Sequence, residues 1–192
     1  MSHIFVISGP SGVGKSSIAQ AILEKYKGRI TYSISMTTRK IRYGEEDGRE
    51  YIFTTVDDFE RLIKEDAFIE YAKVHDNYYG TLKSQIDDAF EKGLAMLLDV
   101  DTKGALNIKS KYPEAVLMFI VPPCIEELKL RLFKRHTDAP EVIERRIHNA
   151  IAEIEKSAQY DYVVKNEDLQ KAIHECTEIM EKHFPFVERR PS

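Results

Sequence analysis

The sequence has 192 residues, enough for one domain with a substantial hydrophobic core. Hydrophobic residues make up 43% of it and charged residues 31%, as in ordinary globular proteins. The formal net charge of −4 argues against a protein that coats nucleic acid or binds an anionic membrane. Two cysteines, Cys124 and Cys176, are too few for a disulfide framework and lack metal-ligand spacing, so we expect reduced thiols.

The first residues form a short apolar run without the charged and small-residue flanks of a usual signal peptide. No apolar stretch approaches the roughly 18–20 residues that are needed to cross a bilayer. We therefore expect a cytoplasmic protein with no membrane partner.

Short apolar runs alternate with segments of helical periodicity, which is typical of an α/β domain with a mainly parallel sheet. Ile143, Ile147, Ile151 and Ile154 repeat at helical spacing and predict one apolar helix face. The candidate buried strands are His3–Ser8, Leu94–Val100, Ala115–Val121 and Tyr162–Val164.

The pattern changes between Arg29 and Tyr79, where polar and apolar residues mix around a glycine-rich hinge. This stretch predicts short antiparallel strands and one helix, Val56–Lys64, inserted beside the parallel core. No internal repeat, low-complexity tract or long linker marks a second independent domain. We expect a single domain.

Residues 9–16 read GPSGVGKS and match the phosphate-binding pattern G-x-x-x-x-G-K-[ST] in full. An apolar strand precedes the loop and a helix-forming segment follows it. Its glycines let successive N–H groups point into one concavity, where they and the helix N-terminus bind phosphate oxygens. Lys15 can reach the β- and γ-phosphates, and the Ser16 hydroxyl can ligate Mg²⁺. The predicted nucleoside triphosphate site consists of Gly9, Ser11, Gly12, Val13, Gly14, Lys15, Ser16 and Ser17.

Two carboxylates, Asp99 and Asp101, follow the apolar run that ends at Leu98. Alternate residues of a strand lie on the same side, so both can face one crevice at the carboxyl end of the sheet. A magnesium site there is one interpretation. Capping of the following helix explains their position equally well.

Arg39, Arg42 and Tyr51 lie close to a hinge between Gly44 and Gly48 and could capture a phosphate. A solvated charge cluster is the simpler explanation of that segment when it is taken alone. A carboxylate in a pocket could also accept hydrogen bonds from N1–H and the exocyclic NH₂ of guanine, an edge that adenine lacks. Glu70 is a candidate, but an exposed strand glutamate fits its position too. These residues alone leave the purine undecided.

Six blocks resemble the guanylate kinase family in order and approximate spacing: GPSGVGKSS, SISMTTRKIRYGEEDGREYIF, FIEYAKVHDNYYGT, LLDVDTKGA, LKLRLFKRHTD and YDYVVKNEDL. The second block is far more diagnostic than the phosphate-binding loop. The resemblance implies a P-loop NTPase-like parallel sheet flanked by helices, with a small mixed α/β GMP-binding insertion and a short lid. The approximate divisions are core 1–32, 82–134 and 156–192, GMP-binding region 33–81 and lid 135–155.

The resemblance also implies roles for individual residues. The GMP phosphate would be held by Arg39, Arg42, Tyr51 and Tyr79, and the guanine would be read by Ser35, Glu70, Thr81 and Asp101. Asp99 would lie near the metal and the transferring phosphoryl group. The ATP phosphates would be reached on lid closure by Arg131, Arg135 and Arg146. Asn166 would contact the adenine end of ATP.

The spacing of the lid residues agrees with these roles. Arg131 and Arg135 are four residues apart, so one helix face can present both, and Pro140 suits the first turn of the next helix. The alternative is that the arginines pair with Glu126, Glu127 and Glu144.

Three residues depart from the usual family pattern, namely Lys103, His136 and Asp76. They bear on nucleotide affinity and lid flexibility more than on the reaction.

The reaction that the resemblance implies is Mg²⁺-dependent, in-line transfer of the γ-phosphoryl group of ATP to GMP without a covalent intermediate. Two rivals are a scaffold module that binds phosphopeptides with the same fold and a kinase with another acceptor, such as a ribose bisphosphate. We expect no nucleic-acid partner, and monomer and homodimer both remain open.

Overall fold

The computed structural model describes residues 3–74, 76–133 and 140–184. At its centre is a parallel sheet with the strand order β2-β7-β1-β8-β9. Each strand predicted from an apolar run is present, with ends within one residue of the prediction, so the parallel α/β core is confirmed. The strands are β1 Ile4–Ser8, β2 Ile30–Tyr32, β7 Ala95–Asp99, β8 Val116–Val121 and β9 Tyr162–Lys165.

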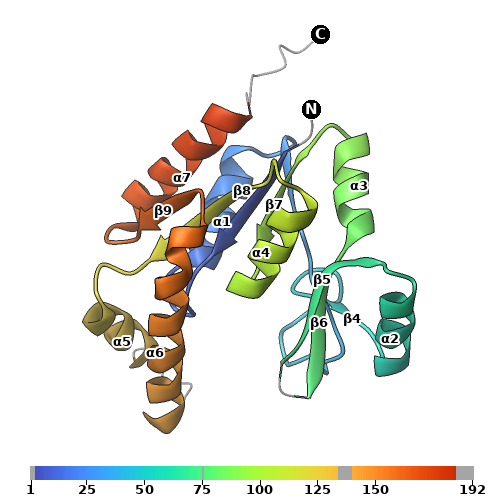
Figure 1. The fold of residues 1–192 in the computed structure, drawn as a ribbon, viewed down its shortest axis with the longest axis horizontal. Helices are drawn as coiled ribbons and strands as arrows, with labels where there is room; N and C mark the ends of the chain where they lie inside the picture. The colour runs from blue at the N-terminus through green and yellow to red at the C-terminus, as the bar shows by residue number, and fades with distance from the viewer. Residues whose placement is uncertain (1–2, 75, 134–139, 185–192) are drawn as a thin grey trace.

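Helices cover both faces of this sheet (Figure 1). On one face Phe5 and Ile7 of β1 pack into a cluster with α1 and α7. On the other face Ile4 and Val6 pack with α3 and α4. The alternation of side chains along a buried strand therefore fills two cores, and each large side chain buried in this way stabilises the fold by about 1.5–3 kcal/mol. These helices are α1 Lys15–Lys25, α3 Lys83–Glu91, α4 Thr102–Lys111 and α7 Leu169–His183.

A second, smaller sheet has the order β4-β3-β6-β5. The helix beside it, α2, spans Val56–Lys64 as predicted, and the Thr55 side chain caps it by accepting a hydrogen bond from the Asp58 N–H at 3.1 Å. These strands are β3 Met36–Thr37, β4 Ile52–Phe53, β5 Phe68–Val74 and β6 Asn77–Leu82.

The pairing in this sheet differs in one respect from the prediction. β6 runs antiparallel to β3 and β5, as expected, but β3 and β4 are parallel. The connection between them, residues 38–51, is long enough for the chain to return to the same end of the sheet before β4 begins.

Two further helices pack on each other beside the carboxyl end of the core sheet, α5 Ile125–Phe133 and α6 Pro140–Ile154 (Figure 1). α6 begins at Pro140 as predicted. Leu128 and Leu132 of α5 pack against Ile143 and Ala150 of α6. The predicted isoleucine stripe is wrong at Ile151, which is 43% exposed, because Ala150 takes the place in the contact. A short 3-10 helix, η1 Glu155–Gln159, leads from α6 to β9.

No helix in residues 3–74, 76–133 and 140–184 is both long and apolar enough to cross a membrane.

Candidate active site

The phosphate-binding loop joins β1 to α1 in a conformation that requires glycine. Gly9 has a φ of 139°, and a Cβ built on it would lie 2.3 Å from the Ile120 carbonyl oxygen of β8. Gly14 has a φ of 103° and directly precedes α1, and a Cβ there would lie 2.4 Å from Nδ2 of Asn166. At both positions φ has a value that residues with a Cβ rarely adopt, and a neighbouring atom leaves no room for a Cβ.

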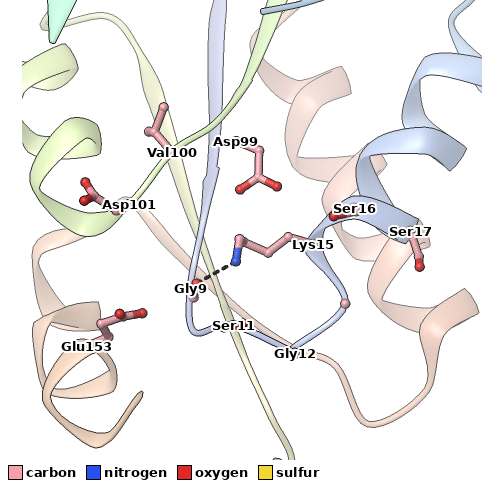
Figure 2. Close-up of a pocket in the computed structure, with 11 residues that line it drawn as sticks. Gly9, Ser11, Gly12, Lys15, Ser16, Ser17, Asp99, Val100, Asp101 and Glu153 are labelled. Carbon is pink, nitrogen blue, oxygen red and sulfur yellow. Dashed lines mark hydrogen bonds between the residues drawn. The ribbon is translucent and has the colours of Figure 1, made fainter. Parts of the chain in front are cut away.

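This loop forms one wall of a pocket of about 370 Å³. The Lys15 ammonium donates hydrogen bonds to the carbonyl oxygens of Gly9 at 2.8 Å and Pro10 at 3.3 Å, so it lies across the floor of the loop (Figure 2). The lining residues are Gly9, Ser11, Gly12, Gly14, Lys15, Ser16, Ser17, Asp99, Val100, Asp101 and Glu153.

Both aspartates predicted at the end of the apolar run face this pocket. Burial raises the pKa of the Asp99 carboxyl above its usual value, and the positive charge of Lys15 works against that shift. Asp101 also caps α4, since its Oδ1 accepts a hydrogen bond from the Gly104 N–H at 2.7 Å. The two interpretations of the pair therefore divide: helix capping applies to Asp101, whereas Asp99 faces Lys15 (Figure 2).

Asn166 supports the loop from behind. Its side-chain amide donates a hydrogen bond to the Val13 carbonyl at 2.7 Å, and both residues are buried. Arg131 of α5 donates to the Asn166 carbonyl at 3.2 Å and forms an ion pair with Glu127 at 3.1 Å. Of the predicted ATP-site residues that are described, Val13, Arg131, Arg146 and Asn166 lie outside the pocket lining.

Arg146 lies on α6, where its side chain is partly exposed. Arg135 lies outside the described residues, as does His136. The alternative pairing of an arginine with Glu127 occurs at Arg131 in this structure.

The predicted phosphate ligands of the acceptor gather at the edge of the second sheet. The Arg39 guanidinium forms a two-pronged ion pair with Glu45, with Nη2–Oε1 at 2.8 Å and Nη1–Oε2 at 3.0 Å. It lies 5.3 Å from the ring centre of Tyr51, whose ring meets Tyr79 edge-on at 5.8 Å. Arg42 contributes its backbone N–H to Glu45 at 2.8 Å, and it is exposed. Three of the four predicted ligands are therefore close together.

Glu45 was not singled out from the sequence, although it holds the central guanidinium of this group. Its hydrogen bond to Arg39 is the main cause that raises the pKa of that guanidinium. A glutamate six residues after an arginine, within an irregular loop, has no periodicity that would mark it as a partner.

The predicted guanine-reading residues lie where the second sheet meets α4. The Thr81 hydroxyl donates a hydrogen bond to Glu70 Oε1 at 2.8 Å, and a Cβ on Gly104 would lie 3.1 Å from Glu70 Oε2. Burial raises the pKa of the Glu70 carboxyl, an effect that the Thr81 hydrogen bond partly offsets. Ser35 is partly buried, and its carbonyl accepts a hydrogen bond from the Ile52 N–H at 3.0 Å. Glu70 is therefore a half-buried, hydrogen-bonded carboxylate and not an exposed strand glutamate.

Glu153 of α6 is a lining residue that sequence reasoning missed. Burial raises the pKa of its carboxyl, with Lys15 opposing the shift and Asp101 adding to it. It lies between Ile151 and Ile154 but off the predicted isoleucine stripe, so its sequence context predicts only a polar helix position.

A strand, a glycine loop that surrounds a lysine, a helix and a carboxylate on the neighbouring strand define a P-loop nucleotide-binding protein. The family model described as guanylate kinase matches residues 1–183. The guanylate kinase of Mycoplasma genitalium is 46% identical over 95% of this chain and 76% of its own length. That of Fusobacterium nucleatum is 44% identical over 94% of this chain and 97% of its own length.

A solved structure agrees with these relatives. The crystal structure of guanylate kinase from Anaplasma phagocytophilum matches with a TM-score of 0.75 at 31% identity and covers 98% of this chain and 88% of that one. The chain belongs to the guanylate kinase family. The predictions of the family, of the fold class and of a guanylate kinase activity are thereby confirmed.

Proposed function

We propose that this enzyme transfers the γ-phosphoryl group of ATP directly to GMP, in line and without a covalent intermediate. The observation that supports this best is the closeness of the loop pocket to Glu70, through the first turn of α4. Asp101 lines the pocket of the phosphate-binding loop and accepts from the Gly104 N–H, and a Cβ on Gly104 would lie 3.1 Å from Glu70 Oε2. A triphosphate bound in the loop and a guanine bound at Glu70 would therefore lie on either side of the first turn of α4.

On the donor side, the loop N–H groups and the N-terminus of α1 would bind the β- and γ-phosphates. Lys15 would leave the carbonyl oxygens of Gly9 and Pro10, to which it now donates, and follow the transferring group. Asn166 would act mainly by fixing the Val13 carbonyl at the back of the loop. Arg131, Arg135 and Arg146 would add positive charge to the phosphates from the lid.

Magnesium fits the oxygen atoms that this pocket offers. Ser16 and Asp99 both line it, and a hydroxyl plus one carboxylate is a donor set that Mg²⁺ takes together with phosphate oxygens and waters. Among the described residues no group of three or more His, Cys, Asp or Glu could hold a metal, so the nucleotide would have to supply most of the coordination. When bound, the ion would neutralise charge that develops on the transferring phosphoryl group.

On the acceptor side, the GMP phosphate would bind Arg39, with Arg42, Tyr51 and Tyr79 completing its shell. Glu70 would accept from N1–H and the exocyclic NH₂ of guanine, with Thr81, Asp101 and Ser35 beside it. The GMP phosphate is already anionic, so no side chain has to become a nucleophile. The protein contributes position and charge neutralisation.

The division of the chain into a core, a GMP-binding region at 33–81 and a lid at 135–155 forms part of this proposal. Closure of the lid would exclude water, which otherwise competes with GMP for the phosphoryl group.

Product analysis tests the proposal. The protein is incubated with ATP and Mg²⁺ and, separately, with GMP, AMP, UMP, CMP or buffer alone, with the Lys15→Ala variant as a matched control. ADP and GDP should appear together, only with GMP, and only weakly in the variant. Nucleotide binding without transfer to GMP would favour the scaffold-module or alternative-acceptor reading.

A further inference from the structure

A carboxylate lies in the pocket where phosphates are expected to bind. Glu153 is contributed by α6 and points into the space between that helix and the loop (Figure 2). Lys15 and Asp101 both act on it electrostatically, and Lys156 is a further cation nearby. Within the described residues the Glu153 side chain makes no hydrogen bond or ion pair, so capping or pairing does not account for a charge at this place.

The charge has opposite consequences with and without a ligand. When the loop is empty, the Glu153 carboxylate attracts the Lys15 ammonium, which favours the charged form of Glu153 despite its burial. When a polyphosphate binds and pairs with the Lys15 ammonium, the Glu153 carboxylate loses its counter-charge and faces an anion. Like charges a few ångströms apart in a partly buried pocket repel strongly.

We propose that Glu153 is a positioning residue that weakens nucleotide binding at the loop, because it stabilises Lys15 in the empty pocket and repels the phosphates that replace it. The inference rests on the proposed function, since it assumes that the loop binds ATP and releases ADP. Its consequence for turnover is that ADP leaves the loop faster than the charge of Lys15 alone would allow.

The fold also places a hydroxyl donor near the Glu153 carboxylate. The hydroxyls of Ser8 and Tyr160 are buried next to each other, and neither has a partner of regular hydrogen-bond geometry among the described residues. Glu153 and Asp101 act electrostatically on Tyr160, which places this hydroxyl near both carboxylates, and burial raises the pKa of Tyr160 to about 12. The Tyr160 hydroxyl therefore stays protonated and could donate to Glu153 when phosphate fills the loop.

The test compares the full-length protein with Glu153→Gln, Glu153→Asp and Glu155→Gln. Glutamine removes the charge and keeps the shape, aspartate keeps the charge, and Glu155 is an exposed glutamate two residues away. Calorimetry measures the Kd of ADP, with and without Mg²⁺, at about 50 mM and 500 mM salt. Steady-state assays measure KM for ATP and kcat.

We expect Glu153→Gln to bind ADP roughly 3- to 10-fold more tightly at low salt, with the gain shrinking at high salt and larger without Mg²⁺. KM for ATP should fall in the same variant while kcat does not rise. Glu153→Asp and Glu155→Gln should stay within about twofold of the parent. A merely structural glutamate would not lower a Kd in this salt-dependent way.

An unchanged or weaker affinity of Glu153→Gln for ADP, in a parent protein that binds ADP, would overturn this inference and leave the proposed function standing. Weaker binding of Mg·ADP alone would show that Glu153 supports the metal complex, which also contradicts the inference. A parent protein that binds no ADP at all would overturn both.

Discussion

Replacement of Gly9 by alanine should damage the enzyme far more than the same replacement at Gly28. Both glycines have a positive φ, 139° at Gly9 and 75° at Gly28. Their surroundings differ, because a Cβ on Gly9 would lie 2.3 Å from the backbone oxygen of Ile120, whereas nothing lies within 4 Å of a Cβ on Gly28. The pair therefore compares alanine in an open left-handed turn with alanine at a position that has both a rarer φ and a contact with β8.

The magnitudes follow from these surroundings. At Gly28 alanine should cost only the strain of a left-handed backbone, about 1–2 kcal/mol. At Gly9 the φ of 139° lies farther from the left-handed well, so the strain is at least as large, and the contact with a central strand adds an overpacking cost of about 1–3 kcal/mol. We expect Gly9→Ala to lower the free energy of unfolding by roughly 2–5 kcal/mol, or to shift the loop out of position instead.

Urea unfolding gives the free energies, and ATP binding reports the position of the loop. Gly9→Ala should lose stability, ATP affinity or both, with kcat/KM for ATP down more than about tenfold, or 1.4 kcal/mol. Gly28→Ala should bind ATP normally. Equal effects of the two substitutions on stability and on ATP binding would refute the reasoning from the contact with Ile120.

Four further changes test individual side chains. Lys15→Ala should lower kcat/KM by more than about tenfold, as steady-state kinetics can show, in a variant that still unfolds cooperatively on heating. Arg39→Ala should cause a similar loss of kcat/KM for GMP. The double variant Arg39→Ala/Glu45→Gln should recover part of that activity, because glutamine removes the carboxylate that loses its arginine beside the phosphate site. Burial raises the pKa of Glu70, so the acid limb of kcat/KM for GMP should lie at a higher pH than an ordinary glutamate would give. Glu70→Gln should lower kcat/KM for GMP more than about tenfold and remove that acid limb. Asp99→Asn should raise the melting temperature by roughly 2–4 °C, the shift that about 1 kcal/mol gives in a chain of this size, while activity falls.

The sign of the Asp99 prediction follows from its raised pKa. A carboxyl whose pKa is higher in the folded protein binds its proton more tightly there, so its favourable contribution is present below the unfolded pKa and is lost as the pH rises through the folded pKa. At neutral pH the charged form therefore costs stability, and the neutral amide relieves that cost. A lower melting temperature in Asp99→Asn, with the fold intact, would contradict this reasoning. Normal kinetics in Lys15→Ala, or in Arg39→Ala, would remove the role assigned to that residue.

The core could be predicted from the sequence because its signals are local. Buried parallel strands give continuous apolar runs, and the loop from Gly9 to Ser16 has a spacing that few other structures require. Helix α2 was predicted at its observed bounds, and a capping threonine, Thr55, marks its start. In each case neighbouring residues alone decide the structure.

The rest depended on contacts between distant segments. The parallel pairing of β3 with β4 is set by the path of the chain through residues 38–51, which no periodicity records. Asn166 reaches Val13 across most of the sequence, so its support of the loop could not be deduced from spacing. Glu153 enters the pocket because of how α6 packs on α5, which the isoleucine spacing predicted only in part.

A rapid-quench experiment with ATP labelled in its γ-phosphate tests direct transfer to GMP most directly. The enzyme, in excess over the labelled ATP, is mixed with Mg²⁺ and GMP, and the label is followed in protein, inorganic phosphate and nucleotides. Our account predicts that label enters GDP at the rate at which ADP forms, with none on the protein at any time. Label that passes through the protein, or that appears as inorganic phosphate while GMP stays unchanged, would contradict it.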